Sequence, residues 1–376
     1  MEDRKQGLVE KYELCKCFQC GKCIAGCPVS LKSALNIRRL IREVMLSNNL
    51  EAIYQRDELW DCTTCQTCTI RCPRGLEPHK LIVDMRANLV EQGNIPKTAG
   101  DALEGVFKHG NPWGRIRSKR SEWANGLGIK DVTQGDKVDI LLFVGCAPSY
   151  DPRVQEVAKA LAKCLFKAGV NFGILGNEES CCGSEVRRMG EEGLFEMLVE
   201  DNLKLFDKYG MTRIVTISPH CYNVFKNEYQ HSNIEVKHYT QYVAELIDTG
   251  KLSFSNELKK VVTYQDPCYL GKQNNIFDEP RSIITAIPGV TFIDFDRSRE
   301  RSLCCEGGGG RMWVEASDSG ERLAEIRIRD AAEMGVEIVA TACPFCLLNL
   351  EDAVKTTGYE GKIEVKDIME LVSEAI

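Results

Sequence analysis

Five cysteines in the last third of the chain form the pattern with the clearest chemical meaning. An adjacent pair precedes a glycine run at 307–310, with one cysteine upstream and a Cys-Pro-Phe-Cys sequence downstream: Cys268, Cys304, Cys305, Cys343 and Cys346. Five thiols exceed what one tetrahedral zinc ion uses, and adjacent cysteines can reach neighbouring irons of a cluster. The glycines remove side chains where backbone passes close to a bulky inorganic body. The pattern therefore predicts an unusual iron–sulfur site.

Two cysteine runs near the N-terminus have the spacing of bacterial ferredoxins. Residues 17–28 and 62–73 both read C-x2-C-x2-C-x3-C-P. In that pattern three thiolates hold three irons of one cubane cluster, and the fourth cysteine holds the other cluster. Structural zinc sites would leave this fourth cysteine unexplained in both runs. We therefore predict two cubane [4Fe–4S] clusters with crossed ligands, one on Cys17, Cys20, Cys23 and Cys72 and the other on Cys62, Cys65, Cys68 and Cys27, with Cys15 as a spare thiol.

Composition and charge narrow the class of protein. The chain of 376 residues is 43% hydrophobic and 27% charged, which is ordinary for a soluble globular protein. The first residues are charged, and no apolar run is long enough to span a bilayer, so we expect a reducing cytoplasm, that of an anaerobe. In that compartment nineteen cysteines favour metal binding over disulfides.

The charge distribution argues against nucleic-acid binding. Residues 1–135 carry 21 Lys and Arg against 16 Asp and Glu, whereas the remainder carries 27 against 39. A nucleic-acid binder would need a concentrated basic patch. The single candidate, the run from Arg115 to Arg120, is expected on a solvated linker or docking surface.

The N-terminal cysteines require a helical support. Apolar residues recur at helical spacing over 35–45 and 81–90, which predicts a helical, two-cluster ferredoxin-like domain over residues 1–95. From residue 96 to 135 glycine and proline interrupt the pattern, which predicts a linker with short helical pieces. Trp113 and Trp123 are expected there as packing anchors.

From about residue 136 the sequence repeats itself. Cys146 corresponds to Cys268, and the pair at 181–182 corresponds to the pair at 304–305. The offset between matching segments grows only from 122 to 129 residues. Short apolar strands alternate with helical stretches such as 154–166, 193–209 and 320–334. This is the signature of a parallel sheet covered on both faces, and each cysteine group follows the end of a strand, where such sheets bind ligands. We predict two duplicated Rossmann-like α/β domains, 136–250 and 251–376.

The two repeats differ by one thiol. Ser218 stands where the second repeat has Cys343. The first repeat therefore keeps four thiols, which could hold zinc, an altered cluster or nothing, and we favour a decayed or modified site. His220 could replace the missing ligand, although a lone histidine is more often a packing residue; Cys164 is expected in the core. The four candidate metal ligands are Cys146, Cys181, Cys182 and Cys221.

These motifs resemble those of the CCG-domain iron–sulfur oxidoreductases, and the whole chain resembles the D-type subunit of heterodisulfide reductase. The likeness is carried by residues 17–23, 60–65, 266–271 and 343–346. It implies a ferredoxin-like part fused to a duplicated CCG part. It also implies a noncubane [4Fe–4S] cluster at the complete motif, where a disulfide can be reduced in one-electron steps. The chain departs from the family at Ser218 and at Glu306, which occupies a position that is usually glycine.

Two functions follow from this resemblance. The first is an electron-transfer subunit of a cytoplasmic, flavin-linked and in some cases electron-bifurcating complex; the missing thiol at residue 218 favours it. The alternative is a catalytic subunit that reduces or oxidises a disulfide or thiol, in which Cys304 and Cys305 are catalytic only if the cluster binds a sulfur substrate. A zinc-stabilised interaction protein is disfavoured by the ferredoxin runs. No Gly-x-Gly-x-x-Gly sequence follows a strand, so a flavin is expected on a partner flavoprotein beside other iron–sulfur subunits.

Overall fold

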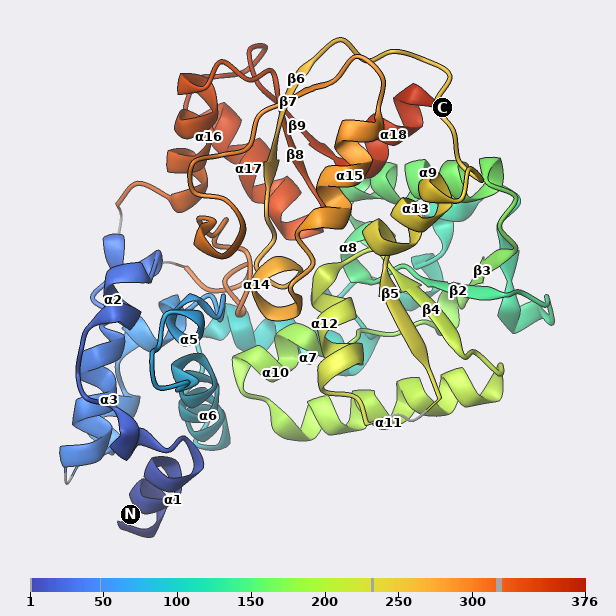
Figure 1. Cartoon of the computed structure of the whole chain (residues 1–376). Coiled ribbons are helices and arrows are strands. Elements are labelled where there is room, and N and C mark those ends of the chain that lie inside the picture. Colours follow the sequence, from blue (N-terminus) through green and yellow to red (C-terminus); the bar gives the residue numbers. More distant parts are fainter. Residues whose placement is uncertain (1, 48, 231–232, 316–319) are drawn as a thin grey trace.

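The computed structural model describes residues 2–47, 49–230, 233–315 and 320–376 (Figure 1). Its N-terminal part, which we call the head (residues 1–95), is helical and lies to one side of the two α/β repeats in Figure 1. The helices of the head are α1 (Glu2–Lys11), α2 (Lys22–Gly26), α3 (Ile37–Leu46), α4 (Glu51–Tyr54), α5 (Thr67–Ile70) and α6 (Pro78–Glu91). The two ferredoxin-type cysteine runs lie on loops and on the short helices α2 and α5.

The first repeat is built on a parallel sheet of five strands in the order β1-β3-β2-β4-β5. Its central strand β2 has the sequence Ile-Leu-Leu-Phe and is buried along its whole length, as expected for a strand covered by helices on both faces. The strands are β1 (Lys130–Asp131), β2 (Ile140–Phe143), β3 (Phe172–Ile174), β4 (Arg213–Thr216) and β5 (Glu235–His238). The helices are α8 (Cys146–Tyr150), α9 (Pro152–Lys167), α10 (Ser184–Met189), α11 (Glu192–Lys208), α12 (Pro219–Asn227) and α13 (Tyr239–Asp248).

The second repeat has a parallel sheet of four strands in the order β7-β6-β8-β9. This is the order of β3-β2-β4-β5 in the first repeat, so the duplication in the sequence is also a duplication of topology. The strands are β6 (Val261–Gln265), β7 (Thr291–Phe292), β8 (Ile338–Thr341) and β9 (Glu364–Asp367). The helices are α14 (Gly271–Asn274), α15 (Asp278–Ala286), α16 (Leu323–Glu333), α17 (Pro344–Thr356) and α18 (Ile368–Ala375).

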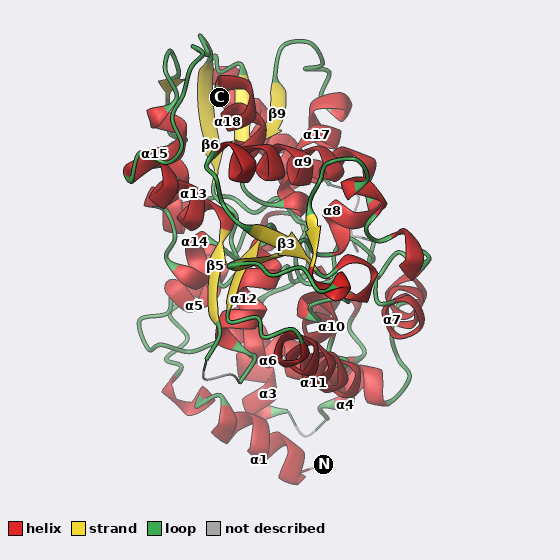
Figure 2. Cartoon of the chain, turned by 90° about the vertical axis from the view of Figure 1, so that its right-hand side faces the viewer, coloured by secondary structure: helices red, strands yellow, loops and turns green. Residues whose placement is uncertain are grey.

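The two repeats share one hydrophobic core. Helices α9 and α13 of the first repeat pack against α18 and α15 of the second, as both views show (Figures 1 and 2). Arg153 donates to Glu351 and Glu370 across this interface at 2.8 and 2.9 Å, and the Tyr239 hydroxyl donates to Asp367 Oδ1 at 2.7 Å. These contacts hold the two sheets in a fixed relation to each other. The prediction of a helical head followed by two parallel α/β units is confirmed.

The segment between head and repeats is more ordered than a linker with short helical pieces. It contains the 13-residue helix α7 (Lys97–His109) and ends in β1, which pairs with β3 in the first sheet. Trp123 is buried and Trp113 packs edge-on against Trp313, as expected of packing anchors. The expectation that the basic run is solvated was wrong for Arg120, because its side chain is buried. Arg115 and Arg117 are exposed, as expected. None of the helices in the described ranges is both long and apolar enough to cross a membrane.

Candidate iron–sulfur sites

The first group of ferredoxin-type thiols lies in one cavity near the surface of the head. Three cysteines of the first run and the fourth cysteine of the second run line this cavity: Cys17, Cys20, Cys23 and Cys72. The loop reaches this shape through left-handed backbone at Gln19 (φ 59°) and Gly21 (φ 80°), the latter placed just before α2. The structure thus brings together the four residues that the crossed assignment groups.

The second group is more deeply buried. Cys62, Cys65 and Cys68 are each at most 8% exposed, and Cys27 of the first run lies among them. Burial raises the pKa of the Cys62 thiol to about 12, with the Cys27 and Cys65 thiols adding to the rise. A cationic metal centre would reverse such shifts, since thiols deprotonate when they ligate metal. In the described residues, no three or more His, Cys, Asp or Glu side chains are arranged to hold one metal ion.

The five cysteines of the second repeat converge at the C-terminal edge of its sheet. Cys268 follows β6, Cys343 follows β8 and directly precedes α17, and Cys346 lies in the first turn of that helix. All five are buried, and the Cys346 thiol donates to Cys305 Sγ at 3.1 Å. Hydrogen bonds from the Cys304 and Cys346 thiols lower the pKa of Cys305 to about 5. The site offers a thiolate in a dry setting, and its donors suit an iron–sulfur cluster.

The glycine run has a role that the sequence did not reveal. A Cβ atom on Gly309 would stand 2.6 Å from the carbonyl oxygen of Cys62, and one on Gly308 would stand 3.1 Å from that of Thr63. Because backbone oxygen cannot yield at such distances, glycine is required for the second ferredoxin loop to approach. The prediction that the run makes room for an inorganic body therefore missed this protein contact.

Polar contacts extend this approach into an interface between the second ferredoxin loop and the second repeat. The Thr64 and Tyr269 hydroxyls lie 2.5 Å apart, and the buried Lys272 Nζ donates to Thr67 Oγ1 at 2.9 Å. A hydrogen bond with Cys304, followed by burial, raises the pKa of Cys65. The second ferredoxin loop therefore packs directly on the five-thiol site.

A fully buried arginine completes this interface. Arg86, on α6, donates to the carbonyl oxygens of Cys62 and Gly309, both at 2.8 Å. It also donates to carbonyl oxygens of Leu59 and Arg188. One guanidinium thus ties the head to both repeats, and places a positive charge beside the second ferredoxin group.

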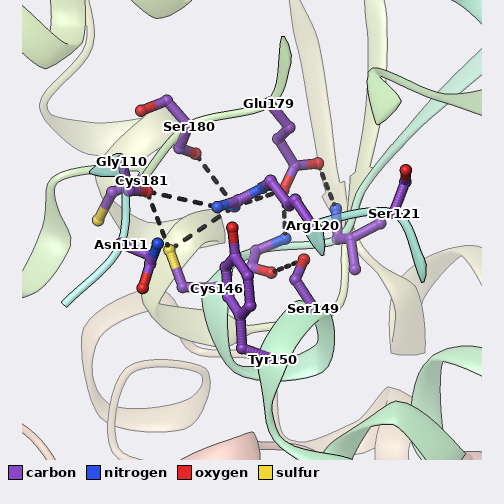
Figure 3. Close-up of polar contacts among 12 residues, drawn as sticks. Gly110, Asn111, Arg120, Ser121, Cys146, Ser149, Tyr150, Glu179, Ser180 and Cys181 are labelled. Carbon is purple, nitrogen blue, oxygen red and sulfur yellow. Dashed lines mark hydrogen bonds and ion pairs between the residues drawn. The ribbon is translucent and has the colours of Figure 1, made fainter. Parts of the chain in front are cut away.

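The four thiols of the first repeat lie together at the matching edge of its sheet. They line a cavity of about 50 Å³ with Ser218, Trp313 and Phe345 on its wall; the thiols are those of Cys146, Cys181, Cys182 and Cys221. The buried Arg120 points at this group, with its Nη2 donating to Cys146 Sγ at 3.6 Å (Figure 3). Glu179 pairs with Arg120 at 2.8 Å and accepts from the backbone N–H groups of residues 144 and 145. Sequence reasoning missed Arg120 because its partner Glu179 is 59 residues away.

Ser218 has a structural role of its own. It is the N-cap of α12, and its hydroxyl oxygen accepts from the backbone N–H of His220 at 3.2 Å. Serine is a favoured N-cap, whereas Cys343, the N-cap of α17, makes no such bond. The first repeat therefore has a capping hydroxyl where the second has a thiol.

His220 serves the other repeat. Its ring stacks on Tyr269 at 4.1 Å between centroids, and its Nδ1 lies 2.8 Å from Glu185 Oε1. Burial lowers the pKa of His220, but the Glu185 charge and a hydrogen bond with Cys343 raise it to about 9. His220 therefore lies between the two sites: it lines the cavity of the first-repeat thiols and stacks on Tyr269 of the second repeat. This stacking and the contact with Glu185 agree with the expectation that a lone histidine is more often a packing residue.

Glu306, the departure from glycine, joins the head to the second repeat. It adopts left-handed backbone (φ 68°), which a non-glycine residue rarely does. Its carboxylate pairs with Lys32 of the head at 3.1 Å and accepts from the backbone N–H of Leu323 at 2.9 Å. Both charged side chains are about nine-tenths buried, so the pair fixes the head against the five-thiol site.

Comparison with known proteins agrees with this arrangement. The model of the 4Fe–4S dicluster domain matches residues 13–76, and that of the cysteine-rich CCG domain matches twice, over residues 140–226 and 262–351. The D-type subunit of the dihydromethanophenazine:CoB–CoM heterodisulfide reductase from Methanosarcina barkeri is 31% identical over 98% of this chain and 95% of its own length. The chain belongs to the D-type heterodisulfide reductase family of CCG-domain iron–sulfur oxidoreductases.

Other members of the family are longer. The probable iron–sulfur-binding oxidoreductase FadF of Bacillus subtilis is 38% identical over 86% of this chain, and EtfAB:quinone oxidoreductase of Syntrophomonas wolfei is 38% identical over 85%. The chain spans about half the length of these two relatives, 47% of each. A hypothetical protein from Helicobacter pylori shares the fold, with a TM-score of 0.57, 11% identity and coverage of 90% of this chain and 66% of its own. Family membership supports two cubane clusters in the head and further cluster binding in the CCG repeats.

Proposed function

We propose that the chain is an electron-transfer subunit of a larger oxidoreductase complex. Its thiols would hold two cubane clusters in the head, with the crossed ligands, and a noncubane [4Fe–4S] cluster on the five cysteines of the second repeat. Such clusters, when bound, supply one-electron chemistry. A flavoprotein or other iron–sulfur subunits of the complex would exchange electrons with the chain in a reducing cytoplasm. The units are the head (1–95) and the repeats (136–250 and 251–376), joined through 96–135.

One observation carries this proposal: the second ferredoxin loop is docked on the five-thiol site. The Cys304 thiol donates to Thr63 Oγ1 at 3.5 Å, and Thr63 is the neighbour of Cys62 in the chain, so a ligand proposed for one cluster contacts the residue next to a ligand proposed for the other. The first group of thiols, in contrast, lies toward the surface. This difference in burial supports electron transfer from the surface of the head to the interior.

Two buried cations beside the second ferredoxin loop favour the binding of anionic clusters there. Arg86 and Lys272 are 0% and 4% exposed and have no ion pair in the described residues; both donate to neutral oxygens around the second ferredoxin loop. A buried charge without a partner is costly. Anionic thiolate-bound clusters on either side would offset that cost, which is the arrangement that an electron relay needs.

The alternative, catalysis on a disulfide at Cys304 and Cys305, has less support. Those two thiols are 3% and 4% exposed, and the Cys304 thiol contacts Thr63 of the head. The cavity of about 50 Å³ beside the first-repeat thiols is lined by neither Cys304 nor Cys305, so it offers no approach for a disulfide to those two thiols. With Ser218 in the first repeat, a second noncubane cluster would also lack a thiolate. These features favour the relay.

Iron content tests the proposal. Anaerobically prepared protein should contain about twelve irons per chain, from three clusters of four. Cys305→Ser should lose about four of these irons, whereas Cys164→Ser, a matched change of a buried core cysteine, should lose none. About eight irons, unchanged by replacing Cys304 or Cys305, would remove the noncubane cluster from the account.

The crossed ligands have their own test. Cys72→Ser should damage the cluster on Cys17, Cys20 and Cys23, because Cys72 lies in their cavity. Cys15→Ser, which changes the spare exposed thiol beside the same cluster, is the control. Loss of the spectroscopic signature of the Cys62 cluster in the Cys72 variant would contradict the crossed assignment.

A further inference from the structure

The two ferredoxin-type thiol groups differ in their exposure to solvent. Cys20 is exposed and the other thiols of the first group are partly exposed, whereas Cys62, Cys65 and Cys68 are buried. The first group is therefore the one that a second protein can approach within a short distance. A docking site for such a protein would lie on the surface around the first group.

That surface is basic because carboxylates are missing from the segments that form it. Residues 14–42 contain six Lys and Arg and no Asp or Glu, and residues 62–76 contain two Arg and again no Asp or Glu. The chain as a whole carries more Asp and Glu than Lys and Arg, 55 against 48. Both segments that form this surface therefore carry only positive charge.

The basic side chains are free of ion pairs and gather around the thiols. Lys22, Arg38, Arg71 and Arg74 are exposed, and none of them makes an ion pair among the described residues. Arg38 and Arg74 line the same cavity as the first thiol group. Arg71 packs over α2, since a Cβ atom on Gly26 would meet its side chain at 2.1 Å.

Apolar side chains accompany the charges. Phe18 lines the same cavity and is 60% exposed, and Ile70, next to Arg71, is 41% exposed. An exposed aromatic ring within a ring of charge is the usual composition of a protein contact, because the apolar centre gives affinity and the charges give orientation. We call Phe18, Lys22, Arg38, Ile70, Arg71 and Arg74 together the basic face.

We propose that the basic face is the docking surface for an acidic one-electron carrier protein. This inference rests on the proposed function, since it requires a cluster on the first thiol group. An acidic partner is attracted to the basic face and repelled by residues 136–376, where Asp and Glu outnumber Lys and Arg by 39 to 27. Long-range fields of this kind steer a carrier to one side of a protein. The carrier would then exchange its electron with the first site, from which the buried contacts lead inward.

The basic residues could instead do no more than balance the charge of the nearby cluster. That role would require them to change the reduction potential of the cluster, but not the encounter with a carrier. The test must therefore measure encounter and potential separately. A purified acidic flavodoxin in its reduced form is a suitable probe, because it delivers single electrons from a negatively charged surface.

The experiment compares three proteins, each prepared as the whole chain with its clusters. These are the unmodified chain, a triple variant of the basic face (Lys22→Gln, Arg38→Gln, Arg74→Gln) and a control that loses the same charge elsewhere (Lys159→Gln, Lys204→Gln, Lys259→Gln). Stopped-flow bleaching gives the second-order rate constant with flavodoxin at low and high salt. Photoreduction by a small deazaflavin gives a reference that needs no docking.

For the triple variant we expect the rate constant at low salt to fall by about tenfold or more, within the range of electrostatic steering. The control should change by less than about twofold, and added salt should slow the unmodified chain because it screens exposed charge. Deazaflavin reduction should persist, and any shift in the midpoint potential of the first cluster should be too small to account for the fall in the rate constant. Failure of both reductants would contradict the proposed function instead.

Two results would overturn the docking proposal. One is a flavodoxin rate constant that is insensitive to both salt and the triple variant, with deazaflavin reduction intact. The other is binding of the unmodified chain, but not of the triple variant, to vesicles of phosphatidylcholine with about one-third phosphatidylserine, together with an unchanged flavodoxin rate. The second result would make the basic face a membrane-facing surface.

Discussion

The two CCG repeats have the same strand order and different chemistry. In the second repeat five buried thiols converge after β6, β7 and β8; in the first, four thiols share their site with Arg120 and with the capping hydroxyl of Ser218. The fold was therefore retained while the residues at its ligand-binding edge diverged. The first repeat also helps to form the site of the second, because Glu185 accepts from the backbone N–H of Gly310 and His220 stacks on Tyr269.

This comparison shows how an incomplete motif can support a complete one. Glu185 accepts from the backbone N–H of Gly310 at 2.6 Å and holds the ring of His220, which reaches Cys343. Burial raises the pKa of the Cys343 thiol, but hydrogen bonds from Cys346 and His220 leave it well below its usual value. The first repeat thus forms one wall of the site that the second repeat builds.

The largest difference between the repeats should appear when the matching cysteines are replaced. Cys305→Ser should abolish the spectroscopic signature of the noncubane cluster, because it removes a thiolate at the complete site. Cys182→Ser, the same change at the matching position of the first repeat, should leave that signature intact. Mössbauer spectra of the two variants make the comparison, and equal loss in both would show that the repeats hold equivalent clusters.

The second largest effect is expected when the buried ion pair of the first repeat is broken. Arg120→Met leaves the carboxylate of Glu179 buried without its partner, which should lower the free energy of unfolding by about 3–5 kcal/mol. The double change Arg120→Met with Glu179→Gln should recover part of this loss. Chemical denaturation of the iron-loaded proteins measures both, and an Arg120 variant as stable as the unmodified chain would contradict a buried, structural pair.

Restoring the missing thiol should have a smaller effect on stability. Ser218→Cys removes the N-cap of α12 and should cost about 1 kcal/mol of the free energy of unfolding. If the pocket accepts a full cluster, iron content should also rise by up to about four per chain. Ser218→Ala, which loses the cap without adding a thiol, is the control, and iron gained equally in both variants would exclude a ligand role for residue 218.

Loss of the contact from His220 should be the smallest effect. A hydrogen bond to a cluster sulfur stabilises the reduced, more negative state, so His220→Gln should lower the midpoint potential of the noncubane cluster by about 40 mV, the equivalent of about 1 kcal/mol. The potentials of the two cubane clusters should not move. A redox titration followed by EPR spectroscopy measures all three, and an unchanged noncubane potential would confine His220 to packing.

The sequence was sufficient to predict the features that depend on local spacing. The two cysteine runs, the duplicated strands and the buried Cys164 all follow from patterns within a few residues of each other. Arg120 and Arg86 could not be found in this way, because their partners are distant in the chain and only the fold decides that they are buried. The glycine run was recognised but explained incompletely, since the loop that approaches it lies more than two hundred residues earlier.

Turnover of a disulfide by the chain alone tests the relay most directly. The protein, reduced anaerobically and freed of other proteins, is given a small disulfide with deazaflavin and light as the only electron source. The relay account predicts no sustained formation of thiol above the rate of deazaflavin alone, while the clusters still take up electrons. Sustained thiol formation by the unmodified chain, abolished in Cys305→Ser and independent of any added protein, would contradict the account and make the five-thiol site a catalytic one.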